Sequence, residues 1–239
     1  MKGYLPAQET IFEKNGAEQR CYGNPDAPFV LIQMVDDRDL AAMESQVAEI
    51  KRLTDTAFFL VAVKVRNWNT DLSPWSAPAV FGKEDFGGGA AETLRAVLDI
   101  CKQQDKTCIL GGYSLAGLFA LWACCQTDVF RAVAAASPSL WFPGFTDYLR
   151  ENRPQAASVY LSLGDREEKT RNPVMAAVGS RIRETYALLQ QQGISTTLEW
   201  NPGNHFKDAH IRTAKAFAWA LEQCSPCVST VFCVGLSTV

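Results

Sequence analysis

Several residue patterns that define large protein classes are scarce or missing in this chain of 239 residues. No run of Lys and Arg stands out and the formal net charge is −3, which argues against nucleic acid or an anionic membrane as a partner. No apolar run is long enough to span a bilayer, and residues Met1 to Pro6 lack the apolar stretch of a signal peptide. We therefore predict a cytoplasmic protein with no nucleic-acid and no membrane partner.

Metal and nucleotide motifs are missing as well. Cys224 and Cys227 have the spacing of a zinc or redox pair, but no second pair with matching spacing completes a four-ligand zinc site. Most of the eight cysteines lie in apolar settings, as Cys101 and Cys108 do, and are expected to be reduced and buried. The glycine patterns of Rossmann and P-loop sites do not occur. The sequence predicts no metal and no cofactor.

What is present is the composition of a soluble globular protein, 47% hydrophobic and 21% charged, and the length suits one sizeable α/β domain. Apolar runs alternate with segments whose apolar residues recur at helical spacing. The predicted strands are Phe29–Val35, Phe58–Val65, Thr107–Gly111, Phe130–Ala136, Ser158–Leu163 and Thr196–Trp200. The predicted helices cover residues 39–53, 90–103, 118–125, 172–192 and 207–222, and a polar and aromatic loop is expected over residues 66–89. This order predicts an α/β fold with a mostly parallel central sheet and helices on both faces.

The predicted domain spans residues 1–222 and leaves a tail over residues 223–239. From Gln223 onward no residue is charged. We expect this tail to be either disordered or docked as a β-like segment. Docking at a subunit contact would make the protein a homodimer.

The segment Gly112-Tyr113-Ser114-Leu115-Ala116-Gly117 carries the strongest functional signal. It lies between an apolar strand and an apolar helix, as a nucleophile elbow does, although Ala116 stands where the motif has its last glycine. In such a turn the Ser114 hydroxyl is exposed above the sheet edge, and the Leu115 N–H points to where an oxyanion forms. The alternative interpretation is an ordinary tight turn.

A serine nucleophile needs a general base, and the chain has two histidines. His205 lies in a loop directly after the last predicted strand, whereas His210 lies within the final helix, so we predict His205 as the base. The acid that orients it is expected after the strand that ends near residue 163. Glu167 is the first choice, because a few residues past the strand end let its side chain reach back over the edge, and Asp165 and Glu168 stay open.

The order Ser114, Glu167, His205 is that of α/β-hydrolases, and three segments resemble the esterase family of that fold that includes enterochelin-type and feruloyl-type esterases. They are residues 111–117, 160–167 and 200–206, within a likeness over roughly residues 9–222. The elbow and the Gly-x-His-Phe segment are its specific parts. The resemblance implies hydrolysis of a carboxylic ester through an acyl-serine intermediate. Some enterochelin-type members lack a clear acid, which leaves the role of Glu167 open.

Two further groups of residues are predicted from their places at strand ends. A second oxyanion donor is expected near Met34, at the end of the strand that begins at Phe29, although Met34 can also be core filler. Aromatic side chains in strand-end loops suit an apolar or aromatic acyl group, or else pack the loops onto the core. The aromatic residues predicted to contact substrate are Trp68, Trp75, Trp141 and Phe206.

The sequence thus predicts a serine esterase whose partner is a small-molecule ester. Three alternatives remain: an acyltransferase or thioesterase of the same fold, a catalytically inactive binding protein of that fold, and a thiol-redox role for the tail cysteines.

Overall fold

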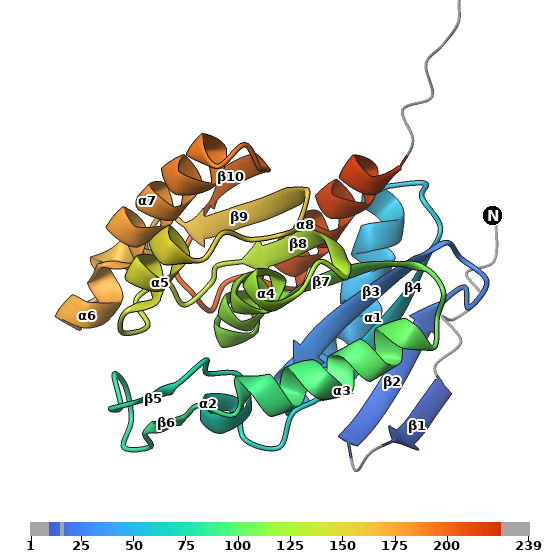
Figure 1. Ribbon diagram of the computed structural model, residues 1–239, viewed down its shortest axis with the longest axis horizontal. Helices are drawn as coiled ribbons and strands as arrows, with labels where there is room; N and C mark the ends of the chain where they lie inside the picture. The colour runs from blue at the N-terminus through green and yellow to red at the C-terminus, as the bar shows by residue number, and fades with distance from the viewer. Residues whose placement is uncertain (1–9, 15–16, 226–239) are drawn as a thin grey trace, which may run out of the picture.

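An eight-stranded sheet forms the centre of the molecule (Figure 1), and its strand order is β1-β2-β4-β3-β7-β8-β9-β10. The computed structural model describes residues 10–14 and 17–225. The strands of this sheet are β1 Thr10–Lys14, β2 Ala17–Gly23, β3 Phe29–Val35, β4 Phe58–Lys64, β7 Thr107–Tyr113, β8 Phe130–Ala136, β9 Ser158–Gly164 and β10 Ser195–Asn201. The short strands β5 Ser76–Ala77 and β6 Phe86–Gly87 form a separate hairpin.

The sheet is mostly parallel, as the sequence predicts. All pairs from β4 through β3, β7, β8 and β9 to β10 are parallel, whereas β1 pairs antiparallel with β2, and β2 antiparallel with β4. The carboxyl ends of the parallel strands therefore meet at one edge of the sheet, which is where sites form in folds of this kind.

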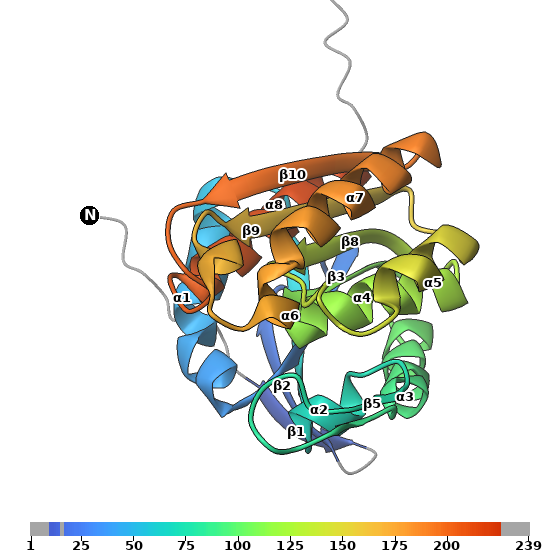
Figure 2. The same ribbon diagram turned by 90° about the vertical axis from the view of Figure 1, so that its left-hand side faces the viewer.

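Helices cover both faces of the sheet (Figures 1 and 2), which confirms the predicted architecture. The helices are α1 Asp37–Leu53, α2 Trp68–Asp71, α3 Ala90–Lys102, α4 Leu115–Gln126, α5 Phe145–Glu151, α6 Pro173–Ala176, α7 Val178–Gln191 and α8 Ala209–Cys224, with a 3₁₀ turn η1 over Glu167–Lys169. One apolar core joins the sheet to α3, α4, α5 and α7, and a second joins it to α1 and α8. Residues of α4 are buried all round, as expected of a helix with no polar face.

Some elements differ from the prediction. The helix expected over residues 172–192 is divided into α6 and α7 at Ala177. Its predicted start is correct, because the Asn172 side chain accepts hydrogen bonds from the N–H groups of Val174 and Met175. The loop expected over residues 66–89 contains α2 and the β5–β6 hairpin, and Asn172 donates to the Val80 carbonyl of that hairpin at 2.7 Å.

The chain end also differs in part from the prediction. Helix α8 continues to Cys224, so the first two residues assigned to the tail are helical. Ser225 is the C-cap of this helix, and residues 226–239 of the predicted tail lie outside the described residues. Within the part of the chain that the structure covers, no helix is long and apolar enough to cross a membrane.

Candidate active site

Ser114 lies at the turn between β7 and α4, at the carboxyl edge of the sheet. Its backbone has φ 58° and ψ −121°, a conformation that L-residues rarely adopt, and its side chain is partly accessible. A β-carbon on Gly112 would lie 2.6 Å from the Ala116 β-carbon. Ala116 therefore fits this tight turn because Gly112 has no side chain, which explains how the motif tolerates alanine at its last glycine position.

His205 lies in the loop between β10 and α8 and contacts both other predicted residues. Its Nε2 is 3.0 Å from Ser114 Oγ, and its Nδ1 is 2.6 Å from Glu167 Oε2. With the proton on Nδ1, the ring donates to the carboxylate and Nε2 accepts from the serine hydroxyl. This is the tautomer in which His205 can take the serine proton.

The three acidic residues after β9 point in different directions. Glu167 is buried and reaches His205, and Asp165 accepts a hydrogen bond from the N–H of Gly203 at 2.7 Å on the surface. Glu168 pairs with Arg183 on the outside of the molecule. Of the three carboxylates, only that of Glu167 contacts the imidazole.

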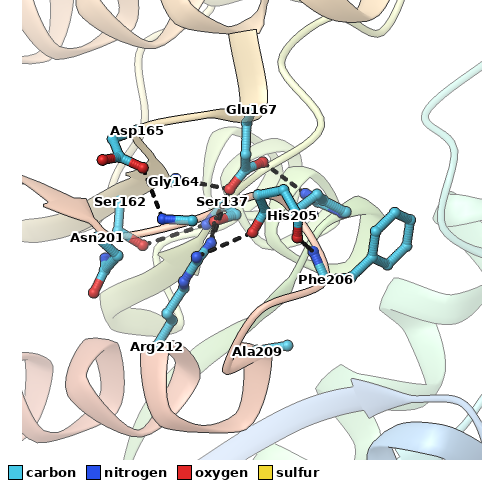
Figure 3. Close-up of polar contacts among 12 residues, drawn as sticks. Ser137, Ser162, Gly164, Asp165, Glu167, Asn201, His205, Phe206, Ala209 and Arg212 are labelled. Carbon is cyan, nitrogen blue, oxygen red and sulfur yellow. Dashed lines mark hydrogen bonds and ion pairs between the residues drawn. The ribbon is translucent and has the colours of Figure 1, made fainter. Parts of the chain in front are cut away.

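The second carboxylate oxygen of Glu167 accepts three hydrogen bonds (Figure 3). The donors are the Gly164 N–H at 2.7 Å, the Ser137 hydroxyl at 2.9 Å and Arg212 Nη1 at 2.9 Å. Ser137 and Arg212 are not predicted from the sequence. With Oε1 satisfied by these donors, Oε2 remains for His205.

Arg212 also holds the loop that carries His205. Its Nη2 donates to the carbonyls of Pro202 at 3.1 Å and Asn204 at 3.0 Å, and its Nη1 donates to the Tyr113 hydroxyl at 3.0 Å. That hydroxyl donates in turn to the His205 carbonyl at 2.7 Å. Burial, and then the charge of the neighbouring carboxylate, raises the pKa of Tyr113 to about 12, so the phenol keeps its proton as a donor.

A further hydroxyl not predicted from the sequence lies beside Ser114. Ser139, in the loop after β8, is 1% exposed, and its Oγ is 3.1 Å from Ser114 Oγ. Because Ser114 donates its proton to His205 in the tautomer described above, the Ser139 hydroxyl is the donor in this contact.

The predicted oxyanion donors lie at the edge of the sheet. Leu115 is the first residue of α4, and the first N–H groups of a helix have no partner within the helix. Met34 lies in β3, and its side chain is fully buried in the core. The role of the main chain near Met34 as a donor stays a prediction.

The predicted aromatic residues occupy two kinds of environment. Trp68, Trp75 and Trp141 pack against or within the core, and the Trp75 indole donates to the Pro143 carbonyl at 3.1 Å. Phe206 is 79% exposed, lies 5.5 Å from the His205 ring between centroids, and points away from the hydrogen-bonded network (Figure 3).

An open cleft of about 320 Å³ lies between the loop after β8 and α6–α7. Trp141 lines it, together with Phe142, Val174 and Arg181. The loop that holds Ser139 beside Ser114 therefore also contributes the aromatic wall of this cleft.

Cys224, the cysteine of the predicted redox pair that lies among the described residues, is a free and half-buried thiol. Burial raises the pKa of Cys224 to about 11, the opposite of what a nucleophilic thiolate needs. Its predicted partner, Cys227, lies outside the described residues.

Comparisons with known proteins identify the fold. No protein-family model matches the chain, and no curated protein does. Among solved structures, an IroE-like serine hydrolase from Shewanella oneidensis is similar, with a TM-score of 0.72, 16% identity and coverage of 92% of this chain and 81% of that one. The siderophore hydrolase EstA from Aspergillus nidulans is similar with a TM-score of 0.67, 18% identity and coverage of 92% and 94%.

The enterobactin esterase FES from Shigella flexneri is a further neighbour, with a TM-score of 0.63 and 15% identity. The match covers 92% of this chain but only 60% of FES. These neighbours confirm the predicted resemblance to esterases and serine hydrolases, and at such identities the likeness establishes the fold. The chain has the α/β-hydrolase fold, as the sequence predicts.

Proposed function

We propose that this protein is a serine esterase that hydrolyses a small carboxylic ester, with Ser114 as nucleophile, His205 as general base and Glu167 as the acid that orients the base. The observation that carries the proposal is the imidazole of His205, which bridges Ser114 Oγ at 3.0 Å and Glu167 Oε2 at 2.6 Å. All three side chains lie where the strands of an α/β-hydrolase end, in the chain order that this fold uses.

The reaction follows from the positions of these atoms. Ser114 Oγ attacks the ester carbonyl while His205 Nε2 takes its proton, and the Leu115 N–H, with a donor near Met34, stabilises the oxyanion. The bond to the leaving oxygen then breaks, and His205 gives its proton to the departing alcohol. Water then attacks the acyl-serine while His205 takes one of its protons. The bond to Ser114 Oγ breaks, His205 returns the proton to that oxygen, and the acid leaves. These steps require no metal and no cofactor.

The substrate class rests on the surroundings of the site. Phe206 exposes an apolar ring beside the base, and we propose an ester with an apolar or aromatic group next to the scissile bond. Two of the similar solved structures are named as a siderophore hydrolase and an enterobactin esterase. Esters of aromatic acids are therefore the first substrates to screen.

A fluorophosphonate probe followed by intact-mass spectrometry tests the nucleophile. We expect one adduct on the wild type, one on the Ser180→Ala control at an exposed helical serine, and none on Ser114→Ala. Heat-unfolded wild type should not react, because an isolated serine is a weak nucleophile. No adduct on folded wild type would contradict the proposal and favour an inactive binding protein.

Turnover of p-nitrophenyl esters of acetate, octanoate and benzoate then tests the reaction. We expect release of free acid that Ser114→Ala and His205→Ala each reduce by about 10⁴-fold or more, because the triad acts as a unit. Acyl transfer to an added alcohol in preference to water, or faster cleavage of the matching thioesters, would favour the acyltransferase or the thioesterase. The cytoplasmic location and the homodimer stay predictions from the sequence.

A further inference from the structure

Arg212 places a positive charge inside the protein, next to the carboxylate that contacts His205. Its side chain is 2% exposed and that of Glu167 is 4% exposed, and the two lie 2.9 Å apart. A buried arginine is costly to desolvate unless its charge is paired and its N–H groups are hydrogen-bonded. None of the bond-making or proton-transfer steps described above involves Arg212 directly.

We propose that Arg212 is a positioning residue that fixes the Glu167 carboxylate and the His205 loop in one arrangement, and offsets part of the negative charge that faces the imidazole. The inference rests on the proposed function, because it concerns the same three side chains.

The positioning follows from the planar fork of the guanidinium. Nη1 donates to Glu167 on one side, and Nη2 donates to the carbonyls of Pro202 and Asn204 on the other. One rigid group therefore sets the distance between the Glu167 carboxylate and the loop that carries His205. A lysine ammonium at this position is a point charge and cannot hold both sides with the same geometry.

The charge effect follows from burial. A lone carboxylate beside an imidazole favours the imidazolium, which cannot accept the Ser114 proton. The guanidinium on the far oxygen of Glu167 opposes that effect, and both charges lie where water screens them little. Removing the guanidinium changes the net charge that the imidazole faces, and the pH dependence of labelling should report that change.

Other titratable groups also lie near His205. Tyr113, from β7, packs on the imidazole at 5.0 Å between ring centroids and stays neutral, because burial raises its pKa to about 12. On the His205 loop itself, Lys207 and Asp208 are exposed and of opposite charge. Asp165 is exposed and accepts from the loop at Gly203.

The test is the rate of fluorophosphonate labelling between pH 5 and pH 9, which needs no knowledge of the substrate. We expect Arg212→Met to lower the maximal labelling rate at least about tenfold. On the acid side of the pH–rate profile, called the acid limb below, the fall in rate should move up by about one pH unit. Arg212→Lys should restore the acid limb through its charge but not the maximal rate. The matched control is Arg183→Met, which breaks the exposed pair with Glu168 and should leave the profile unchanged.

A double variant separates the proposed role from a general loss of fold. Arg212→Met leaves Glu167 buried without its cation, whereas Arg212→Met with Glu167→Gln removes both charges. If Arg212 acts through the carboxylate charge, the double variant has the acid limb of Glu167→Gln alone. A further shift in the double variant, or an unshifted acid limb in a folded Arg212→Met, overturns the inference and leaves the proposed function standing. A wild type that does not label overturns both.

Discussion

The carboxylates of Glu167 and Glu168 are neighbours in the chain but differ in surroundings. The Glu167 side chain is 4% exposed and contacts His205, whereas that of Glu168 is 33% exposed and pairs with Arg183. Glu167→Gln keeps the shape of the side chain but removes the charge that stabilises the imidazolium in the proposed mechanism. We expect ester turnover to fall by about 10³- to 10⁴-fold, measured as kcat with a p-nitrophenyl ester.

Glu168→Gln is the matched control, because it makes the same chemical change one residue further on. Its turnover should stay within about twofold of the wild type, since exposed ion pairs contribute little. Comparable losses in both variants would show that the effect comes from the η1 turn and not from the contact with His205.

The residues that the sequence did not indicate are those whose position depends on packing. The sequence placed three acids in the right segment, but their directions are set by the η1 turn, which no local pattern specifies. Arg212 lies in the first turn of α8 within an ordinary helical pattern, and it meets Glu167 only because α8 packs on the sheet. Ser139 lies beside Ser114 because of the path of the loop after β8. A histidine directly after a strand, by contrast, is a signal that the chain itself carries.

At the scale of elements, the elbow depends on close packing between β7 and α4. Gly112→Ala would put the new β-carbon 2.6 Å from the β-carbon of Ala116, so the strand and the helix would have to separate. Overpacking of this kind costs about 1–3 kcal/mol. We expect the free energy of unfolding in urea to fall by that amount and fluorophosphonate labelling to slow.

Exchanging the two residues gives the matched control. In Gly112→Ala combined with Ala116→Gly, the space that the new side chain needs is vacated, and part of the lost stability should return. The free energy of unfolding should not recover fully, because glycine in a helix costs about 1 kcal/mol relative to alanine. A double variant no more stable than Gly112→Ala would contradict the packing explanation.

Elements with continuous apolar runs were the ones that the sequence predicted best. Strands β3 and β8 have the predicted bounds, since their burial on both faces leaves a clear mark in the chain. Strand β2 was missed because Ala17–Gly23 has mixed polarity and becomes a strand by pairing with β4. The division between α6 and α7 was missed because both halves keep helical spacing.

At the scale of the whole molecule, the first turn of α1 makes stability depend on pH. Burial, and then the nearby Asp36, raises the pKa of Asp39 from 3.8 to about 6. This pKa lies above that of the unfolded chain, so the folded protein holds the Asp39 proton more tightly than the unfolded chain does. The contribution of protonated Asp39 to the free energy of unfolding is therefore complete below about pH 4 and is lost as the pH rises through 6. For this partly exposed group, a shift of about two pKa units changes the free energy of unfolding by less than about 3 kcal/mol.

Urea unfolding at pH 4, 5, 6 and 7 measures this contribution as the difference between Asp39→Asn and the wild type. Asparagine keeps the acceptor for the Asp36 N–H but does not ionise, so the variant should gain stability relative to the wild type as the pH rises. The control is Asp37→Asn, at an exposed residue of the same turn. A difference that stays constant from pH 4 to pH 7 would contradict the assignment to Asp39.

The backbone of Ser114 has a consequence for the stability of the whole protein. Its φ of 58° with ψ of −121° costs a non-glycine residue on the order of 1–3 kcal/mol. Glycine adopts this conformation freely, so Ser114→Gly should be more stable than Ser114→Ala by about 1 kcal/mol, although neither has the hydroxyl. Thermal unfolding of the two variants side by side measures the difference, and equal stability would show that the turn is relaxed.

The proposed catalytic role of Ser114 and the stability of the protein therefore oppose each other at this residue. Mutants selected for heat resistance alone, with no requirement for turnover, should accumulate glycine at position 114. The same selection carried out with an ester as the required nutrient should retain the serine and gain its stability elsewhere in the chain.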